Sequence, residues 1–502
     1  MLRSASWAAG GLLLAACVLP NPAYDDSGAA GGEVSSGSGS QSGSGTLSGT
    51  SGSGSAGTSG SSGVSVGSTD AATTSGAAST GVGTAGPSTS DASASTTVGT
   101  TGCGDNCPPG PPLEWAVAIG GSGHQEVDNV VLSPNGDIYV IGAYNGELVI
   151  DDPNFQAVPA SLGDDVFFAR FTSSGELGSL AVINAPGPQQ AEGLVRDSLG
   201  NLFLAICSGG DMSLAGDMVL NKGGLDAIVI KTNAQGLVLD HHAFTGPGDQ
   251  CGLDLAIDET DELALVGHYV SSLNSEYSGL LQNGGPTVAG FVIRIGKNNA
   301  AKWSASLAGS GEVTPTGVAA TTDDHLAIAG SFRNGGIGFG NATLTNKGAA
   351  DVFVLKVKRD TGALAWLFGD GGAQPQRATN VAVDPTDNSI LVAGGFLGKV
   401  ASVTTMSPDL DAFLKRMTPK GVNAWAIGAG ADGLDTSDAL ATNAGGSALW
   451  GANISGSLVV GDAPVESGAG FFLAERGPGD VILWAAGYAA TAGVTLEDVA
   501  ID

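Results

Sequence analysis

From residue 113 to the end of the chain, short apolar runs alternate with clusters of turn-forming residues at regular intervals. One recurring run, such as Asp137-Ile-Tyr-Val-Ile-Gly142, ends in Gly. Its copies end at Gly142, Gly267, Gly330, Gly394 and Gly451. The steps from 267 to 330 and from 330 to 394 are 63 and 64 residues, and a further copy that ends in Cys207 fills the longer first step. The pattern therefore predicts six repeats of about 60 residues.

Each repeat contains four short segments that read as strands. A first strand and a tight turn precede the Gly-ended strand, and the turns include Pro134-Asn135-Gly136 and Ser198-Leu199-Gly200. A third strand usually opens with Asp, as in Asp351-Val-Phe-Val-Leu-Lys356. A fourth strand usually opens with Trp, and these residues are Trp115, Trp303, Trp366, Trp425 and Trp484.

Four antiparallel strands per repeat, repeated radially, are typical of a β-propeller, and we find no sustained helical periodicity. The fold class is therefore all-β, a propeller of six four-stranded blades over residues 113–502. A β-sandwich array needs about 100 residues per unit and a β-helix needs shorter coils, so both fit the period less well. The strands at Trp115 and Val499 are left over in a six-bladed ring, or pair as an incomplete seventh blade that closes it.

These repeats resemble the bacterial beta-propeller repeat family of secreted and surface proteins. The resemblance rests on the Trp-x-x-x-x-Gly openings, the Gly-ended strand and the Asp-[Ala/Val]-[Phe/Ile] strand, and it covers residues 113–502. Repeat 2 lacks both the Trp and the Gly, and repeat 3 has His241-His242 in place of the Trp. Members of the family generally have no assigned activity, so the resemblance implies a fold rather than a function.

The start of the chain has the features of a secretory signal peptide. Arg3 supplies a positive charge, and the apolar run that follows is too short to span a bilayer. The run ends in Leu14-Ala15-Ala16-Cys17, which resembles the lipobox of bacterial lipoproteins. That resemblance implies cleavage after residue 16 and lipidation of Cys17. By resemblance to the sorting of enterobacterial lipoproteins, Val18 in place of Asp implies the outer membrane, on its surface or its periplasmic face.

Residues 17–112 are predicted to be a disordered linker. The stretch from Ser27 to Thr101 is almost entirely Ser, Gly, Thr and Ala, and it lacks aromatic and basic residues. Such a composition buries too little apolar surface to offset the entropy lost on ordering. The linker ends in a Cys- and Pro-rich segment.

Lipidation of Cys17 leaves four cysteines, an even number in a compartment that permits disulfides. Cys103 and Cys107 close a small loop, so we expect them to pair, although half of a metal site is the alternative. Cys207 then pairs with Cys251. In a propeller these two residues lie at the same end of adjacent blades, because consecutive antiparallel strands reverse direction.

No catalytic, metal-binding or cofactor motif stands out. The five His residues lack ligand spacing, and His241 and His242 point to opposite faces of a strand. His268 and His325 are expected at exposed turns. The Asp that opens four third strands is a calcium ligand or, as we prefer, a residue that binds nearby backbone N–H groups.

The excess of acidic residues in the propeller region makes one class of partner unfavourable. The propeller region holds 43 of the 49 acidic and 18 of the 19 basic residues, which argues against nucleic-acid binding. We expect a lipid-anchored extracytoplasmic propeller that contacts the membrane only through its anchor. It is a non-catalytic module that binds an unknown protein or glycan. The alternative is an enzyme that acts on envelope or extracellular glycans from a site in the propeller channel.

Overall fold

The computed structural model describes most of the chain beyond residue 114. The described residues are 115–152, 157–275, 279–282, 287–297, 301–405, 408–430, 433–455, 458–460, 463–465, 470–489 and 495–501. The predicted signal peptide and linker, with Cys17, Cys103 and Cys107, lie outside them, so what we expect of these parts stays a prediction. In the described part of the chain, no helix is long and apolar enough to cross a bilayer.

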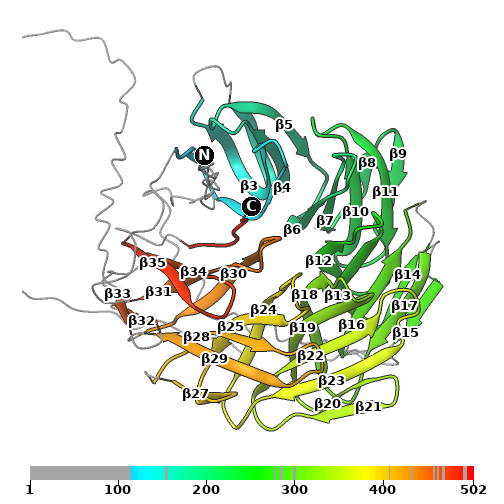
Figure 1. The fold of residues 1–502 in the computed structure, drawn as a ribbon. Coiled ribbons are helices and arrows are strands. Elements are labelled where there is room, and N and C mark those ends of the chain that lie inside the picture. Colours follow the sequence, from blue (N-terminus) through cyan, green and yellow to red (C-terminus); the bar gives the residue numbers. More distant parts are fainter. Residues whose placement is uncertain are drawn as a thin grey trace, which may run out of the picture. The chain divides into compact units, whose positions relative to one another are not determined.

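Six four-stranded antiparallel blades follow one another in chain order around a ring (Figure 1). Blade 1 consists of β2 (Gln125–Leu132), β3 (Ile138–Ile150), β4 (Val158–Phe171) and β5 (Leu177–Ile183), and β1 (Ile119–Gly120) pairs with β3. Blade 2 consists of β6 (Gln189–Arg196), β7 (Leu202–Ser208), β10 (Asp226–Thr232) and β11 (Val238–Phe244). Blade 3 consists of β12 (Gln250–Ile257), β13 (Leu263–Val270), β16 (Val288–Ile295) and β17 (Ala301–Leu307). Blade 4 consists of β18 (Glu312–Ala320), β19 (His325–Arg333), β22 (Ala350–Lys358) and β23 (Leu364–Asp370). Blade 5 consists of β24 (Gln376–Val383), β25 (Ile390–Phe396), β28 (Asp411–Met417) and β29 (Asn423–Gly430). Blade 6 consists of β30 (Thr436–Thr442), β31 (Ala448–Ile454), β34 (Gly470–Arg476) and β35 (Ile482–Ala489). The all-β fold, the strand order and the six predicted blades are confirmed.

Five blades carry an additional hairpin between their second and third strands, which the sequence analysis did not predict. The hairpins are β8 (Met212–Leu214) with β9 (Asp217–Val219), β14 (Ser272–Ser275) with β15 (Gly279–Gln282), β20 (Gly336–Phe339) with β21 (Ala342–Thr345), β26 (Lys399–Val400) with β27 (Val403–Thr404), and β32 (Leu458–Val460) with β33 (Ala463–Val465). Some hairpins pair with the preceding blade, as where Thr245 pairs with Asn274 and where β32 pairs with β29. Because strands alternate in direction, all hairpins lie at one end of the ring, the hairpin end. The tight turns lie at the other, the turn end.

Apolar cores between neighbouring blades hold the ring together. Five hydrophobic clusters each combine the facing sides of two consecutive blades, from blades 1 and 2 to blades 5 and 6. Both sides of a strand such as β7 or β25 are therefore buried along its whole length. This explains why the strands are apolar nearly throughout, with a mean hydropathy of +0.17 for the chain.

Two of the Trp residues that mark the repeats join their blade to the next at the turn end. Trp303 of blade 3 donates from Nε1 to the carbonyl oxygen of Arg359 in blade 4, at 2.8 Å, and its ring lies over Gly362. Trp366 of blade 4 makes the same contact with Pro419 of blade 5, at 3.0 Å. Contacts between blades therefore explain the Trp at these two positions.

We expect Gly362→Ala to lower the free energy of unfolding by about 1–3 kcal/mol, because a new methyl group forces overpacking. A Cβ at this position would lie 2.8 Å from the Trp303 ring, and the φ angle of Gly362 is +65°. Gly372→Ala is the matched control, since a Cβ there has nothing within 4 Å. Urea unfolding of the two variants tests this, and equal midpoints would contradict the contact.

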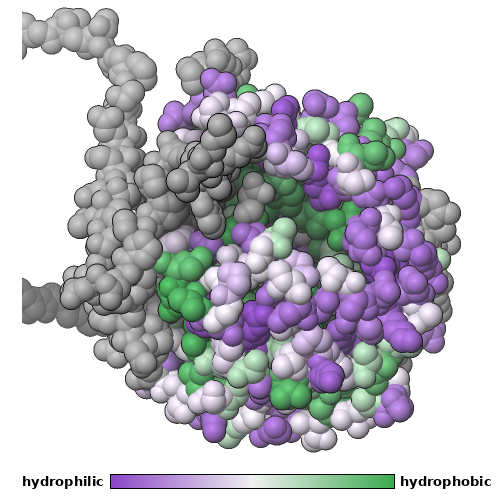
Figure 2. Space-filling model, in the orientation of Figure 1, coloured by the Kyte–Doolittle hydropathy of each residue, from purple (hydrophilic) through white to green (hydrophobic). Residues whose placement is uncertain are grey.

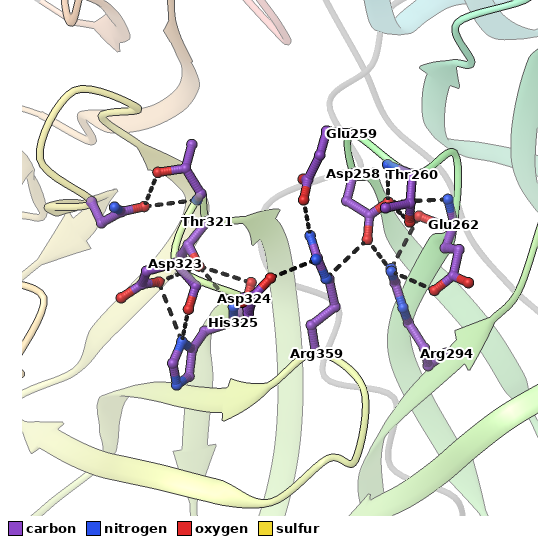
Figure 3. A network of polar contacts seen from close by, with 12 residues as sticks. Asp258, Glu259, Thr260, Glu262, Arg294, Thr321, Asp323, Asp324, His325 and Arg359 are labelled. Carbon is purple, nitrogen blue, oxygen red and sulfur yellow. Dashed lines mark hydrogen bonds and ion pairs between the residues drawn. The ribbon is translucent and has the colours of Figure 1, made fainter.

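Ion pairs reinforce the turn end. In five blades a basic residue near the end of the third strand pairs with an Asp at the first turn, and the pairs are Arg170–Asp137, Lys231–Asp197, Arg294–Asp258, Lys356–Asp323 and Arg416–Asp384. Arg359 of blade 4 also reaches into blade 3, where it lies 2.7 Å from Glu259 and 3.2 Å from Asp258 (Figure 3). Many charged residues at this end therefore stabilise the fold through ion pairs within and between blades.

Candidate functional site

A group of carboxyl groups near the axis of the ring is the first candidate site. The inner strand of each blade contains a β-bulge, and the residue at the bulge is Asp128 in β2 and Glu192 in β6. In β30 the bulge includes Asp438. In blades 3 to 5 the bulge holds Leu253, Thr316 and Thr379 instead. A bulge changes the direction of its side chain. The three acidic bulge residues lie on one side of the ring, because blades 6, 1 and 2 are neighbours. Glu126 and Glu497 complete this group, which we call the axial carboxyl group.

Burial and mutual repulsion favour the protonated forms of these acids. Burial, together with Glu126, Glu192 and Glu497, raises the pKa of Asp128 to about 9. Burial and Glu126 raise the pKa of Glu192 to about 8. The pKa values of Asp438 and Glu497 are also raised, mainly by burial. We therefore expect Asp128 and Glu192 to be mostly neutral at pH 7.

The axial carboxyl group adjoins the paired cysteines. Cys207 and Cys251 lie at disulfide-bonding distance, with Cα atoms 5.2 Å apart, and they join blades 2 and 3 as predicted. Oε1 of Glu192 lies 3.8 Å from Sγ of Cys207 and 3.5 Å from Sγ of Cys251. Among the described residues, these three are the group whose ligand atoms come together within 4.8 Å. Both sulfur atoms are used in the disulfide, so this geometry is not that of a metal site.

The histidines are placed partly as expected. His241 and His242 are consecutive on β11 and therefore point to opposite faces. His325 begins β19 and contacts Asp323. The expectation of an exposed turn is wrong for His268, which lies inside β13 opposite Cys251. The buried core of the blade accounts for this position, and burial lowers the pKa of His268.

The Asp residues that open the third strands accept hydrogen bonds from backbone N–H groups. This is the interpretation that we preferred to a role as calcium ligands. Asp226 accepts from the N–H of Lys222 at 2.7 Å and from that of Gly246 at 3.0 Å. Oδ2 of Asp351 likewise accepts from the N–H of Lys347 at 2.6 Å. These carboxylates hold the hairpin-end connections in place.

A second candidate site is an exposed apolar surface at the turn end of blade 2. It consists of Leu199 in the first turn, Leu237 in the turn before β11 and Leu239 in β11, which are 75%, 64% and 48% exposed. We call it the blade 2 apolar surface. Val422, Val481 and Leu483 occupy the corresponding outer positions of blades 5 and 6 and are also exposed. In the view of Figure 2, apolar residues also appear in a hollow near the middle of the ring, while polar residues predominate on the surrounding blades.

Sequence analysis missed both sites. Aligning the first strands of the repeats would have found the acidic position shared by Asp128, Glu192 and Asp438. It would also have found a buried Gln that begins four of these strands. Gln376, for example, donates to the carbonyl oxygen of Leu397 at 2.9 Å.

No known protein family matches the chain, and no curated protein matches it either. Solved structures similar to it include a protein of unknown function from Bacteroides caccae, with 11% identity over 61% of this chain and 94% of that chain, at a TM-score of 0.30. Another is the Pan2 WD40 domain of Neurospora crassa, with 8% identity over 71% and 91% and a TM-score of 0.34. A third is a catalytically inactive virginiamycin B lyase from Staphylococcus aureus, with 9% identity over 55% and 95% and a TM-score of 0.24.

Proposed function

We propose that this chain is a lipid-anchored, extracytoplasmic β-propeller that binds a partner protein at the cell envelope without catalysing a reaction. The observation that carries this proposal is the blade 2 apolar surface. Leu199, Leu237 and Leu239 belong to two turns and one strand at the same end of one blade, and all three are largely exposed. Single exposed apolar residues are ordinary, whereas three at the same end of one blade favour an interaction site.

The surroundings of this surface suit a binding site that stays rigid. Asp197 of the first turn accepts hydrogen bonds from the N–H groups of Leu199 and Asn201, so the backbone that carries Leu199 is held in place. Ser198 beside it donates to Asp261 of blade 3 through both its N–H and its hydroxyl group, each at 2.7 Å. A preorganised apolar surface loses little entropy when a partner covers it. An apolar surface of this kind favours a protein partner over a polar glycan.

The test is site-specific photo-crosslinking in cells that carry the full chain. A photoreactive residue at position 237 is expected to give a discrete crosslinked protein, and the same residue at Met218 should not. Met218 and Leu220 are exposed apolar residues at the hairpin end of the same blade, 64% and 54% exposed, so they are matched controls.

With the crosslinked protein purified, L237D/L239D is expected to weaken its binding at least about tenfold, because a charge in an interface centre is costly. M218D/L220D should leave the Kd unchanged. The proposal is wrong if position 237 yields no specific product or if both double variants weaken binding equally. Protease added to intact cells would report in the same strain whether the domain is outside the outer membrane.

A second candidate function is an enzyme that acts on glycans in the channel, which the axial carboxyl group favours. A protonated buried carboxyl such as Asp128 is suited to act as a general acid. Hydrolysis of a glycan by the full chain, together with loss of turnover in Asp128→Asn and normal turnover in L237D/L239D, would establish this function in place of the first.

A further inference from the structure

The junction between blade 6 and blade 1 differs from the five other junctions. Elsewhere one shared cluster joins two blades, but here each blade has its own cluster. Leu496 and Val499 pack against blade 6, and Ala500 packs against blade 1. Trp115 also packs against blade 1. Trp115 and residues 495–501 therefore occupy the position that a seventh blade would have.

The C-terminal segment, residues 495–501, sits as the inner strand of that missing blade would. Asp254 in the inner strand of blade 3 accepts from the N–H of Val318 in blade 4, at 2.7 Å. Asp498 accepts in the same way from the N–H of Val130 in blade 1, at 3.0 Å. The sequences around the two carboxyl groups also correspond, since Asp254-Leu-Ala-Ile-Asp258 matches Asp498-Val-Ala-Ile-Asp502.

Trp115 makes the equivalent contact at the outer edge. Its Nε1 donates to the carbonyl oxygen of Ser173 in the last turn of blade 1, at 3.0 Å. Trp303 and Trp366 make this contact with the blades that follow them. Both terminal segments thus hold blade 1 as a preceding blade would.

Besides this apolar packing, one side chain of blade 6 binds the backbone of the C-terminal segment. Asn453 of β31 donates from Nδ2 to the carbonyl oxygen of Leu496 at 3.1 Å, and its Oδ1 accepts from the N–H of Leu496 at 2.6 Å. These two bonds and the Asp498–Val130 bond connect the segment to both neighbouring blades.

The carboxyl groups on this segment face other carboxyl groups. Glu497 interacts with Asp438 of β30 and Glu126 of β2, and it acts in turn on Asp128 of β2. Asp498 interacts with Asp254 of β12 and with Glu497. Glu192 of β6 faces Asp128. The charged groups that act on Glu497 and Asp498 in the described part of the chain are thus all acidic.

We propose that residues 495–501 form a pH-sensitive latch that closes the ring when these carboxyl groups are protonated and is released as they ionise. Docking raises the pKa of Asp498 from 3.8 to about 7, mainly through burial, and also raises that of Glu497. The docked state therefore binds more protons than the released state. The contribution of Asp498 to docking is therefore fully present below about pH 4. It decreases as the pH rises and is lost above about pH 7. The facing Asp128 contributes in the same direction, because Glu497 of the segment is one of the groups that raise its pKa.

Hydrogen exchange of the full chain at pH 5.5, 7.0 and 8.5 tests the latch. We expect the protection factor of the peptide that covers 495–501, corrected for the intrinsic exchange rate, to fall about tenfold or more from pH 5.5 to 8.5. Peptides from β19 and β22 of blade 4 should keep their protection. The double variant E497Q/D498N removes the charges of the segment but keeps acceptors, so its protection should fall much less. E176Q, on an exposed turn of blade 1, should behave as the unmodified chain does.

Constant protection of 495–501 over this pH range in the unmodified chain would overturn the proposal, and this measurement needs no variant to fold. An equal fall in E497Q/D498N and in the unmodified chain would also overturn it. Loss of protection throughout the molecule at pH 8.5 would indicate global unfolding instead of latch release, which is likewise contrary to the proposal.

Discussion

Replacement of Arg294 by Met is expected to lower the free energy of unfolding by about 3 kcal/mol, because it leaves a buried carboxylate without its main partner. The side chains of Arg294 and Asp258 are both fully buried and form an ion pair. Arg294 also lies 3.0 Å from Glu262. Arg359 remains 3.2 Å from Asp258 in the variant, so we expect the lower end of the usual range for breaking such a pair. Urea unfolding of the full chain measures the change.

Two further variants separate this effect from a general loss of charge. Arg333→Met removes a surface pair with Glu312, in which the Arg side chain is 51% exposed, and should cost less than about 1 kcal/mol. R294M/D258N should recover part of the loss, because no uncompensated carboxylate remains. If R294M and R333M shift the midpoint equally, the network at the turn end contributes no more than an ordinary surface pair.

Removing the bridge between Cys207 and Cys251 is expected to lower the free energy of unfolding by about 4 kcal/mol. The chain-entropy estimate for a closed loop gives this value for a sequence separation of 44 residues. The double variant C207A/C251A should show the loss as a lower urea midpoint than that of the oxidised chain. Addition of a reductant during unfolding should lower the midpoint of the unmodified chain and leave the double variant unchanged.

The single variants provide the control for the bridge. C207A and C251A should each lose nearly as much as C207A/C251A, since either change alone abolishes the bond. Additive losses would instead indicate two independent packing effects, and the bridge would then contribute little. Free thiols at both positions in non-reducing peptide mapping would exclude the bridge directly.

The rigidity of the turn end bears on the proposed binding function. The ion pair of Arg359 with Asp258 joins blades 3 and 4, and Ser198 and Asp261 join blades 2 and 3. The blade 2 apolar surface is therefore presented by a turn that is bonded to its neighbour. We expect R294M, which removes an ion pair within blade 3, to alter stability without altering the Kd for the partner.

The sequence by itself determined the fold, because a local pattern of apolar strands and turn residues recurs six times, and an opening Trp marks several of the copies. Cys207 and Cys251 could be paired from the sequence once the strand directions were assigned. The tertiary structure alone decided which residues meet across the ring. Asp128, Glu192, Asp438 and Glu497 are far apart in the chain, and only closure of the ring brings their carboxyl groups together. The same holds for Asp498, whose role depends on Val130, 368 positions away. The exposure of Leu237 was likewise hidden in the sequence, since a Leu in a strand-rich repeat is ordinarily read as core, and only packing determines which side chains the neighbouring blades leave uncovered.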